Sequence, residues 1–230
     1  MAKFAVYTIP PADNILYQRG SELLGYDIRT GEFLPEDNAT RRILPEFDSS
    51  WVTKPQTYGF HMTTGYSLFY NPTTLPQIEA EIELVLSCFG RDVSFILDPA
   101  EDPIPFWNDT IAVLHFVPNP AMLMLHTMLT ARVNPYGTSS SISEAFLKKN
   151  PEEVDVVKAA RVQNFYTPHI LDGWIPHFSL MYPYNGQQPH LMKQALLKLF
   201  PPKRLPVKSI CLLIREGNDT HYRLYREFFL

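Results

Sequence analysis

Two stretches of the chain, YGFHMTTGYSL at residues 58–68 and WIPHFSLMYPY at residues 174–184, decide the predicted fold. Both are rich in aromatic residues, with threonines in the first, and this composition favours strands. Each holds a histidine followed two positions later by a hydroxyl side chain: His61 and Thr63 in the first, His177 and Ser179 in the second. Side chains two apart on a strand point to the same face, so each stretch presents an imidazole and a hydroxyl together.

The segments that follow the two motifs repeat the same order of features. Each motif precedes a helix pattern, then a strand, and then an Asn-Asp-Thr triplet that opens another strand; the triplets are residues 108–110 and 218–220. Such internal similarity is typical of a duplicated structural unit. We therefore predict a single bilobal domain over residues 1–230, whose repeated halves span about 51–133 and 173–230, with residues 134–172 inserted between them.

The rest of the chain gives the expected fold class. Alternation and short apolar runs predict further strands at residues 4–9, 93–97, 110–117, 207–214 and 221–229. Helical spacing of apolar residues predicts helices at 75–89, 121–133, near 151–163, and 190–200. Residues 12–50 are polar and interrupted by Gly and Pro, which predicts irregular structure. We expect an α+β fold with two pseudo-symmetric lobes, each an antiparallel sheet with helices on its outer face, around a central cleft.

Composition narrows the possible partners and compartment. Hydrophobic residues make up 45% and charged residues 19% of the chain, and the net charge is −4. A protein that grips long nucleic acid usually has a basic excess, so we expect a small phosphodiester or a short RNA end rather than a long duplex. No apolar run approaches the ~20 residues that cross a bilayer, so we expect no membrane partner and a soluble, cytoplasmic monomer. Cys88 and Cys211 lie in apolar runs, which favours two buried free thiols over a disulfide.

The paired motifs predict a specific chemistry if their strands face one cleft. One neutral imidazole would take a proton from an attacking water, while the other, as imidazolium, would give a proton to the leaving oxygen. The hydroxyls of Thr63 and Ser179 would donate hydrogen bonds to the non-bridging oxygens of a phosphodiester. This scheme needs no metal and no cofactor. A single strand histidine is more often a packed or surface residue, but the equivalent positions of His61 and His177 in the repeat favour catalysis.

GFHMTTGYSL and PHFSLMYPY resemble the two HxT/S signatures of the two-histidine (2H) phosphoesterase superfamily, which includes 2′-5′ RNA ligase-like proteins and cyclic nucleotide phosphodiesterases. The resemblance covers both halves of the chain. It implies a bilobal fold, with His61 and His177 as the catalytic pair and Thr63 and Ser179 as phosphate binders. The position after each hydroxyl is usually apolar in the family; Leu180 fits and Thr64 departs.

The implied function is hydrolysis of a 2′,3′-cyclic nucleotide, an RNA end or an ADP-ribose cyclic phosphate, and the motifs do not separate these substrates. Tyr58 and Tyr182 are candidates for substrate binding because a base could stack on either ring. Lys54, Arg132 and Arg161 are candidate phosphate-binding cations.

Two other functions remain open from the sequence. A binding module could keep the same cleft to hold a nucleotide or RNA end without catalysis. A metal-dependent hydrolase could use several of the seven histidines, but the chain lacks HxH, HxxxH or HD spacing, so it ranks last.

Overall fold

The computed structural model describes residues 2–148 and 155–230. The strands are β1 (Lys3–Thr8), β2 (Tyr26–Asp27), β3 (Glu32–Phe33), β4 (Met62–Tyr70), β5 (Ile96–Pro99), β6 (Phe106–Trp107), β7 (Ile111–Pro118), β8 (Gly137–Ser139), β9 (His177–Met181), β10 (Leu205–Pro206), β11 (Ser209–Arg215) and β12 (Arg223–Phe229). The helices are α1 (Ile15–Leu24), α2 (Ala39–Arg42), α3 (Thr53–Gln56), α4 (Leu75–Ser87), α5 (Pro120–Val133), α6 (Ser141–Leu147), α7 (Val156–Phe165) and α8 (Pro189–Leu199).

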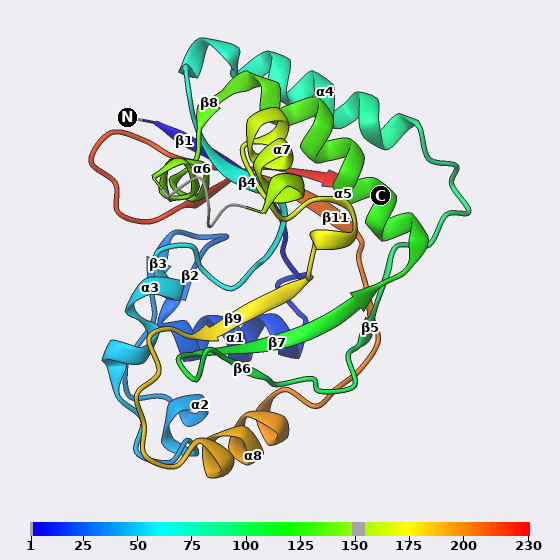
Figure 1. Cartoon of the computed structure of the whole chain (residues 1–230). Coiled ribbons are helices and arrows are strands. Elements are labelled where there is room, and N and C mark those ends of the chain that lie inside the picture. Colours follow the sequence, from blue (N-terminus) through cyan, green and yellow to red (C-terminus); the bar gives the residue numbers. More distant parts are fainter. Residues whose placement is uncertain (1, 149–154) are drawn as a thin grey trace.

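One strongly curled antiparallel sheet organises the described residues. Its strand order is β10-β5-β7-β9-β4-β1-β11-β12, with β6 beside β7 and β8 beside β4, while β2 and β3 form a separate hairpin. Figure 1 shows α4 and α5 together above the sheet and α1 and α8 on the lower side. The predicted α+β class with an antiparallel sheet and helices is therefore confirmed, and each predicted strand and helix overlaps an observed one.

The centre of the sheet joins segments that are distant in sequence. β4 and β9, which carry the two histidine motifs, are neighbours, and they lie between β1 on one side and β7 on the other. Along β9 the residues alternate between buried and partly exposed from His177 to Leu180. Phe178 packs its ring on Phe60 with centroids 4.7 Å apart, and both are fully buried. The phenylalanine layer fixes one face of the two strands in the core, so the histidines face the other way.

The prediction of irregular structure for residues 12–50 was wrong. Helix α1 lies there; the side chain of Asn14 caps its first turn, and Gly25 ends it at φ 74°. These are ordinary start and stop signals. The helix approaches the sheet closely at Gly20, where a Cβ would stand 2.2 Å from the ring of Phe60. Tyr17, Leu23 and Leu24 of the same helix are also buried, so α1 packs one face against the core.

Two smaller predictions also need comment. Cys211 is buried as expected, but Cys88 is exposed, so the prediction of two buried thiols was wrong for Cys88. It directly follows the last residue of α4, at the C-terminal end of the helix, where Ser87 is exposed as well. The predicted helix near 151–163 falls in part on residues 151–154, which lie outside the described residues; the described part is α7.

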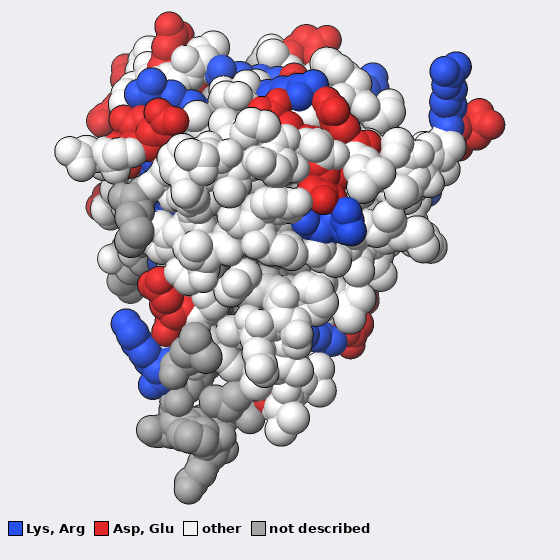
Figure 2. Space-filling model, turned by 90° about the horizontal axis from the view of Figure 1, so that it is seen from above, with Lys and Arg blue, Asp and Glu red and all other residues white. Residues whose placement is uncertain are grey.

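Charged side chains of both signs are intermixed on the upper face of the molecule (Figure 2). Arg226 of β12 bridges Glu79 and Glu83 of α4, with N–O distances of 2.5 and 2.6 Å. Arg132 of α5 pairs with Glu81 at 2.7 Å. These ion pairs tie helices and sheet together on this face and leave its charges largely matched. In the described part of the chain, no helix is both long and apolar enough to span a bilayer.

Candidate active site

The pairing of β4 with β9 brings the two histidine motifs to one face of the sheet. Met62 pairs with Phe178 in antiparallel register, and both side chains are buried. Continuing that register by one residue in each direction sets His61 opposite Ser179 and Thr63 opposite His177. Opposite residues share a face, so two imidazoles and two hydroxyls point the same way, with diagonal Cβ neighbours about 7–8 Å apart.

The two imidazoles are held in the same manner. His61 Nδ1 lies 2.9 Å from the carbonyl oxygen of Gly59, and His177 Nδ1 lies 2.8 Å from that of Ile175. A carbonyl can only accept, so Nδ1 carries the hydrogen in each ring and donates it two residues back along the chain. In the neutral ring this leaves the lone pair on Nε2. Thr63 Oγ1 lies 3.4 Å from His61 Nε2, which marks this nitrogen as the one on the hydroxyl side.

Aromatic rings surround both imidazoles. The ring of Tyr7 stacks on His61 with centroids 3.7 Å apart and an interplanar angle of 18°. Trp107 meets His177 edge to face at 4.6 Å and remains partly exposed. His115 of β7 pairs with His177 in the ladder, so its side chain lies beside it on the same face. The pair is therefore set into an apolar surround and keeps partial access to solvent.

These apolar surroundings lower the pKa of both imidazoles. The pKa of His61 is lowered to about 4, mainly by burial and in smaller part by the nearby His177. Burial likewise lowers the pKa of His177 to about 4, with added effects of His115 and His169. A hydrogen bond to a backbone carbonyl opposes the fall in each case. Both rings are thus neutral at pH 7 in the free protein, with Nε2 ready to accept a proton.

The two predicted substrate-binding tyrosines have different surroundings. Tyr58 lies with its ring centroid 6.2 Å from that of His61, so it lines the site. Tyr182 directly follows β9, at the end opposite His177, about 16 Å along the strand. Its ring packs under Lys54, whose Nζ lies 3.9 Å from the centroid. Tyr58 and Tyr182 are therefore not brought together, and Lys54 belongs with Tyr182.

The other predicted cations are already paired with carboxylates. Arg132 donates two hydrogen bonds to Glu81 at 2.8 and 3.0 Å. Arg161 forms an ion pair with Asp172. Neither guanidinium is a free phosphate ligand in this arrangement.

Sequence reasoning missed several groups that line or support the site. Tyr7 lies in β1, whose six residues are all buried, and nothing in its own sequence context distinguishes it. Trp107 lies in the short strand β6, which was not predicted. Trp174 opens the second motif stretch; it is 5% exposed and donates from Nε1 to the carbonyl oxygen of Thr63 at 3.0 Å. Its ring lies flat on His126 at 4.1 Å, so it holds the backbone of the first motif in place.

The departure from the expected pattern at Thr64 has a structural cause. Between Tyr7, which pairs with Thr63, and Val6, which pairs with Gly65, β4 contains one extra residue. That residue is Thr64, so it occupies a β-bulge. It is fully buried, and its hydroxyl lies 2.8 Å from that of Thr8, which satisfies both. A polar residue is tolerated here because the neighbouring strand supplies its partner.

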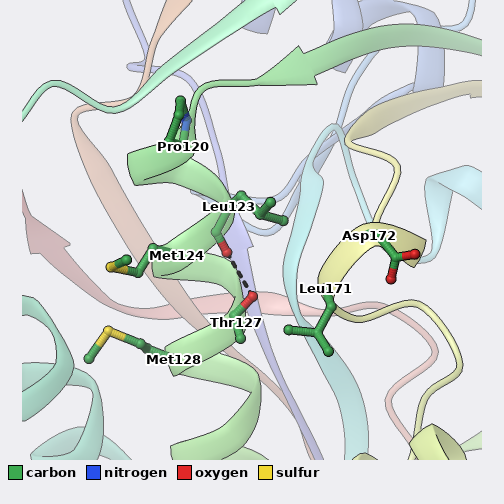
Figure 3. A pocket seen from close by; sticks show the side chains of 7 residues that line it. All are labelled: Pro120, Leu123, Met124, Thr127, Met128, Leu171 and Asp172. Carbon is green, nitrogen blue, oxygen red and sulfur yellow. Dashed lines mark hydrogen bonds between the residues drawn. The ribbon is translucent and has the colours of Figure 1, made fainter.

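A separate apolar groove of about 320 Å³ lies between α5 and the short turn Leu171–Gly173 (Figure 3). It is lined by Pro120, Leu123, Met124, Thr127, Met128, Leu171 and Asp172. Its only hydroxyl, that of Thr127, donates to the carbonyl oxygen of Leu123 at 2.8 Å, and Asp172 is engaged by Arg161. None of the residues that line the groove therefore offers a free acid, base or nucleophile.

In residues 2–148 and 155–230, no group of three or more His, Cys, Asp or Glu side chains is placed to hold a metal ion. No model of a known protein family matches the chain, and a search of curated proteins finds no significant relative.

Proposed function

We propose that this chain is a metal-independent phosphoesterase of the two-histidine type, which hydrolyses a small cyclic phosphodiester to a monoester by acid–base catalysis. The observation that carries the proposal is the matched anchoring of the two imidazoles. Each donates from Nδ1 to the carbonyl two residues before it, and the β4–β9 register sets both rings on one face with a hydroxyl beside each. Packing alone would not require the same tautomer at both positions.

The proposed reaction uses this chain's own groups at each proton step. Nε2 of one neutral imidazole accepts a proton from water as the water oxygen forms its bond to phosphorus. Nε2 of the other, as imidazolium, gives a proton to the ribose oxygen as the old P–O bond breaks. Thr63 and Ser179 donate hydrogen bonds to the non-bridging oxygens. The side on which the leaving oxygen binds decides which of His61 and His177 is the acid.

The acid must acquire its proton after the substrate binds. With pKa values of about 4 for His61 and His177, the free protein holds almost no imidazolium at neutral pH. An anionic phosphodiester between the rings favours the charged form, and an opposite charge at such range raises a pKa by about 1–3 units. Substrate binding therefore recruits the proton that the leaving group later receives.

The strand order supports the finer fold expectation of two pseudo-symmetric lobes. Reading outward from the β4–β9 pair, β1 corresponds to β7 and β11 to β5, and each of these pairings is antiparallel. In this scheme each lobe contributes one central strand with one histidine motif. The substrate would then lie across the boundary between the lobes.

The alternative is a non-catalytic module that binds a nucleotide or RNA end in the same cleft. One observation favours it: both imidazoles are neutral at pH 7, and binding requires no proton donor. The catalytic proposal is preferred because a hydroxyl accompanies each imidazole and each Nδ1 donates to a backbone carbonyl, which leaves the lone pair on Nε2.

The test is hydrolysis of a panel of 2′,3′-cyclic nucleotides and ADP-ribose 1″,2″-cyclic phosphate in EDTA. Wild type is compared with His61→Ala, His177→Ala and the control His190→Ala, whose histidine is exposed on α8. We expect each site variant to lose about 10²- to 10⁴-fold in kcat, while the control retains full activity. Thermal unfolding checks that the variants are folded. Full activity in either site variant would exclude catalysis by the histidine pair, whereas no turnover of any panel member by wild type would favour the binding module.

A further inference from the structure

The last residue of β11, Arg215, lies on the same face of the sheet as the histidine pair. The β1–β11 register pairs Lys3 with Arg215 and Tyr7 with Cys211. The β1–β4 register pairs Tyr7 with Thr63. Paired residues and alternate residues along a strand share a face, so Lys3, Tyr7 and Arg215 point to the side on which Thr63 lies.

Aromatic rings connect the guanidinium of Arg215 to the histidine pair. Its Cζ lies 5.4 Å from the ring centroid of Tyr222. The Tyr222 ring is 6.2 Å from that of Tyr7 and stacks on Tyr58 at 5.6 Å. The ring centroids of Tyr7 and Tyr58 in turn lie 3.7 and 6.2 Å from that of His61. Two aromatic rings, that of Tyr222 and then that of Tyr7 or Tyr58, therefore separate the guanidinium of Arg215 from the imidazole of His61.

Two hydrogen bonds to residues distant in sequence hold Tyr222 at the centre of this row of rings. The amide of Tyr222 donates to the carbonyl oxygen of Thr57 at 3.0 Å, next to Tyr58. The hydroxyl of Tyr222 also forms a short hydrogen bond with Ser67 of β4. Tyr222 is fully buried, whereas Tyr58 and Arg215 keep partial exposure. The row thus has a fixed centre with an accessible ring and an accessible guanidinium on either side.

The guanidinium of Arg215 has no carboxylate partner among the described residues and is therefore a candidate anion-binding group. Among the described residues its guanidinium forms no ion pair and no side-chain hydrogen bond, whereas Arg29 and Arg226 are bound by carboxylates. Its partner in the ladder is Lys3, and like charges opposite one another are unfavourable. Burial, and then the charge of Arg215, lower the pKa of Lys3, while Glu144 of α6 opposes this. An anion at Arg215 would offset the repulsion.

We propose that Arg215 binds a second phosphate of the substrate, one nucleoside away from the phosphodiester held between His61 and His177. The inference rests on the proposed function and deepens it. The preferred substrate is then a nucleoside with phosphates at both ends of its ribose, as at the end of a short nucleotide chain, and not a bare cyclic mononucleotide. A guanidinium can bind such a phosphate through two parallel N–H···O bonds, and Tyr58 lies along the path where a base can stack.

A matched pair of probes tests this: adenosine 2′,3′-cyclic phosphate with and without a 5′-phosphate. For wild type we expect kcat/KM to be about 10- to 100-fold higher for the 5′-phosphorylated probe, the usual range for hydrogen bonds to a charged group. In Arg215→Gln the ratio of the two values falls to about 1, and in Arg215→Lys part of it remains. Arg91→Gln is the control, because this exposed arginine lies in the turn after α4; its ratio should equal that of wild type.

Binding of unreactive ligands separates failure of the subsite from failure of the hydrolase. We would measure Kd for adenosine 3′-monophosphate and adenosine 3′,5′-bisphosphate by calorimetry. If wild type turns over neither probe but binds the bisphosphate about 10- to 100-fold more tightly, and Arg215→Gln removes that preference, the subsite stands and the hydrolase proposal fails. The subsite is overturned if wild type binds neither ligand or shows no preference, if the preference survives in Arg215→Gln, or if that variant weakens both ligands equally.

Discussion

The pH dependence of kcat/KM is the sharpest consequence of the histidine pair. This parameter reports the protonation of the free enzyme, which must hold one neutral and one protonated imidazole to react. Both pKa values lie at about 4 in the free protein. Well above that value the fraction with one proton on the pair falls tenfold for each pH unit, to the order of 10⁻³ at pH 7. We therefore expect log kcat/KM to fall with a slope of −1 from about pH 5 to about pH 8.

The value of kcat should behave differently, because the bound phosphodiester raises the pKa of the proton donor. An opposite charge at this range raises a pKa by about 1–3 units, so the descending limb of kcat should lie that far above the limb of kcat/KM. The phosphodiester itself remains a monoanion throughout, so the substrate contributes no limb. The separation between the two limbs measures the proton recruitment directly.

The assay is initial-rate hydrolysis of the best panel substrate at half-unit pH steps, in EDTA and at constant ionic strength. Circular dichroism checks at each pH that the protein is folded. His190→Gln, with its exposed imidazole on α8, is the matched control and should reproduce the wild-type profile. A plateau of kcat/KM between about pH 5.5 and 7.5 would refute the reasoning, because it would require the pair to hold one proton at neutral pH without substrate.

Three further predictions test the site and its frame. Thr63→Val and Ser179→Ala should each lower kcat/KM by about 10²- to 10³-fold in the hydrolysis assay, as expected for lost oxyanion donors, with the midpoint of thermal unfolding unchanged. Trp107→Ala should raise KM for cyclic nucleotides by about 5- to 100-fold at constant kcat, since a base can stack on its partly exposed ring; a fall in kcat alone would instead make it a positioning residue. Gly20→Ala should lower the free energy of unfolding in urea by about 1–3 kcal/mol, because a Cβ there would meet a phenylalanine ring at 2.2 Å, whereas Gly90→Ala, where nothing lies within 4 Å, should not.

The sequence predicted the elements that have a strong local pattern. Helices α4 and α5 and the strands β1, β4, β7, β9, β11 and β12 follow from apolar spacing and strand propensity, because burial of one face imposes a period on the sequence. Helix α1 was missed because the Gly and Pro interruptions of residues 12–50 outweighed its short apolar pattern, although Tyr17, Leu23 and Leu24 are buried. Its caps, Asn14 and Gly25, were the available clue.

The pairing of the two histidine strands could not be read from the sequence. Local patterns indicate that His61 and Thr63 share a face, but not that β9 lies beside β4 with Met62 against Phe178. The pairing joins residues more than 100 positions apart, so no local signal encodes it. The same holds for Tyr7 and Arg215, which reach the site through the β1 and β11 registers.

The ladder between β1 and β4 contains two irregularities that together keep the motif and the core on opposite faces of β4. One extra residue of β4, Thr64, lies between the partners of Tyr7 and Val6, and a second lies between the partners of Val6 and Phe4. Because two single-residue shifts restore the original phase, Thr63 stays on the face of Tyr7, while Leu68, the partner of Phe4, is buried on the other face. At the first irregularity Thr64 is fully buried, and its hydroxyl lies 2.8 Å from that of Thr8 on the neighbouring strand. The polar side chain is therefore accommodated because β1 supplies a hydrogen-bond partner that no local pattern in β4 reveals.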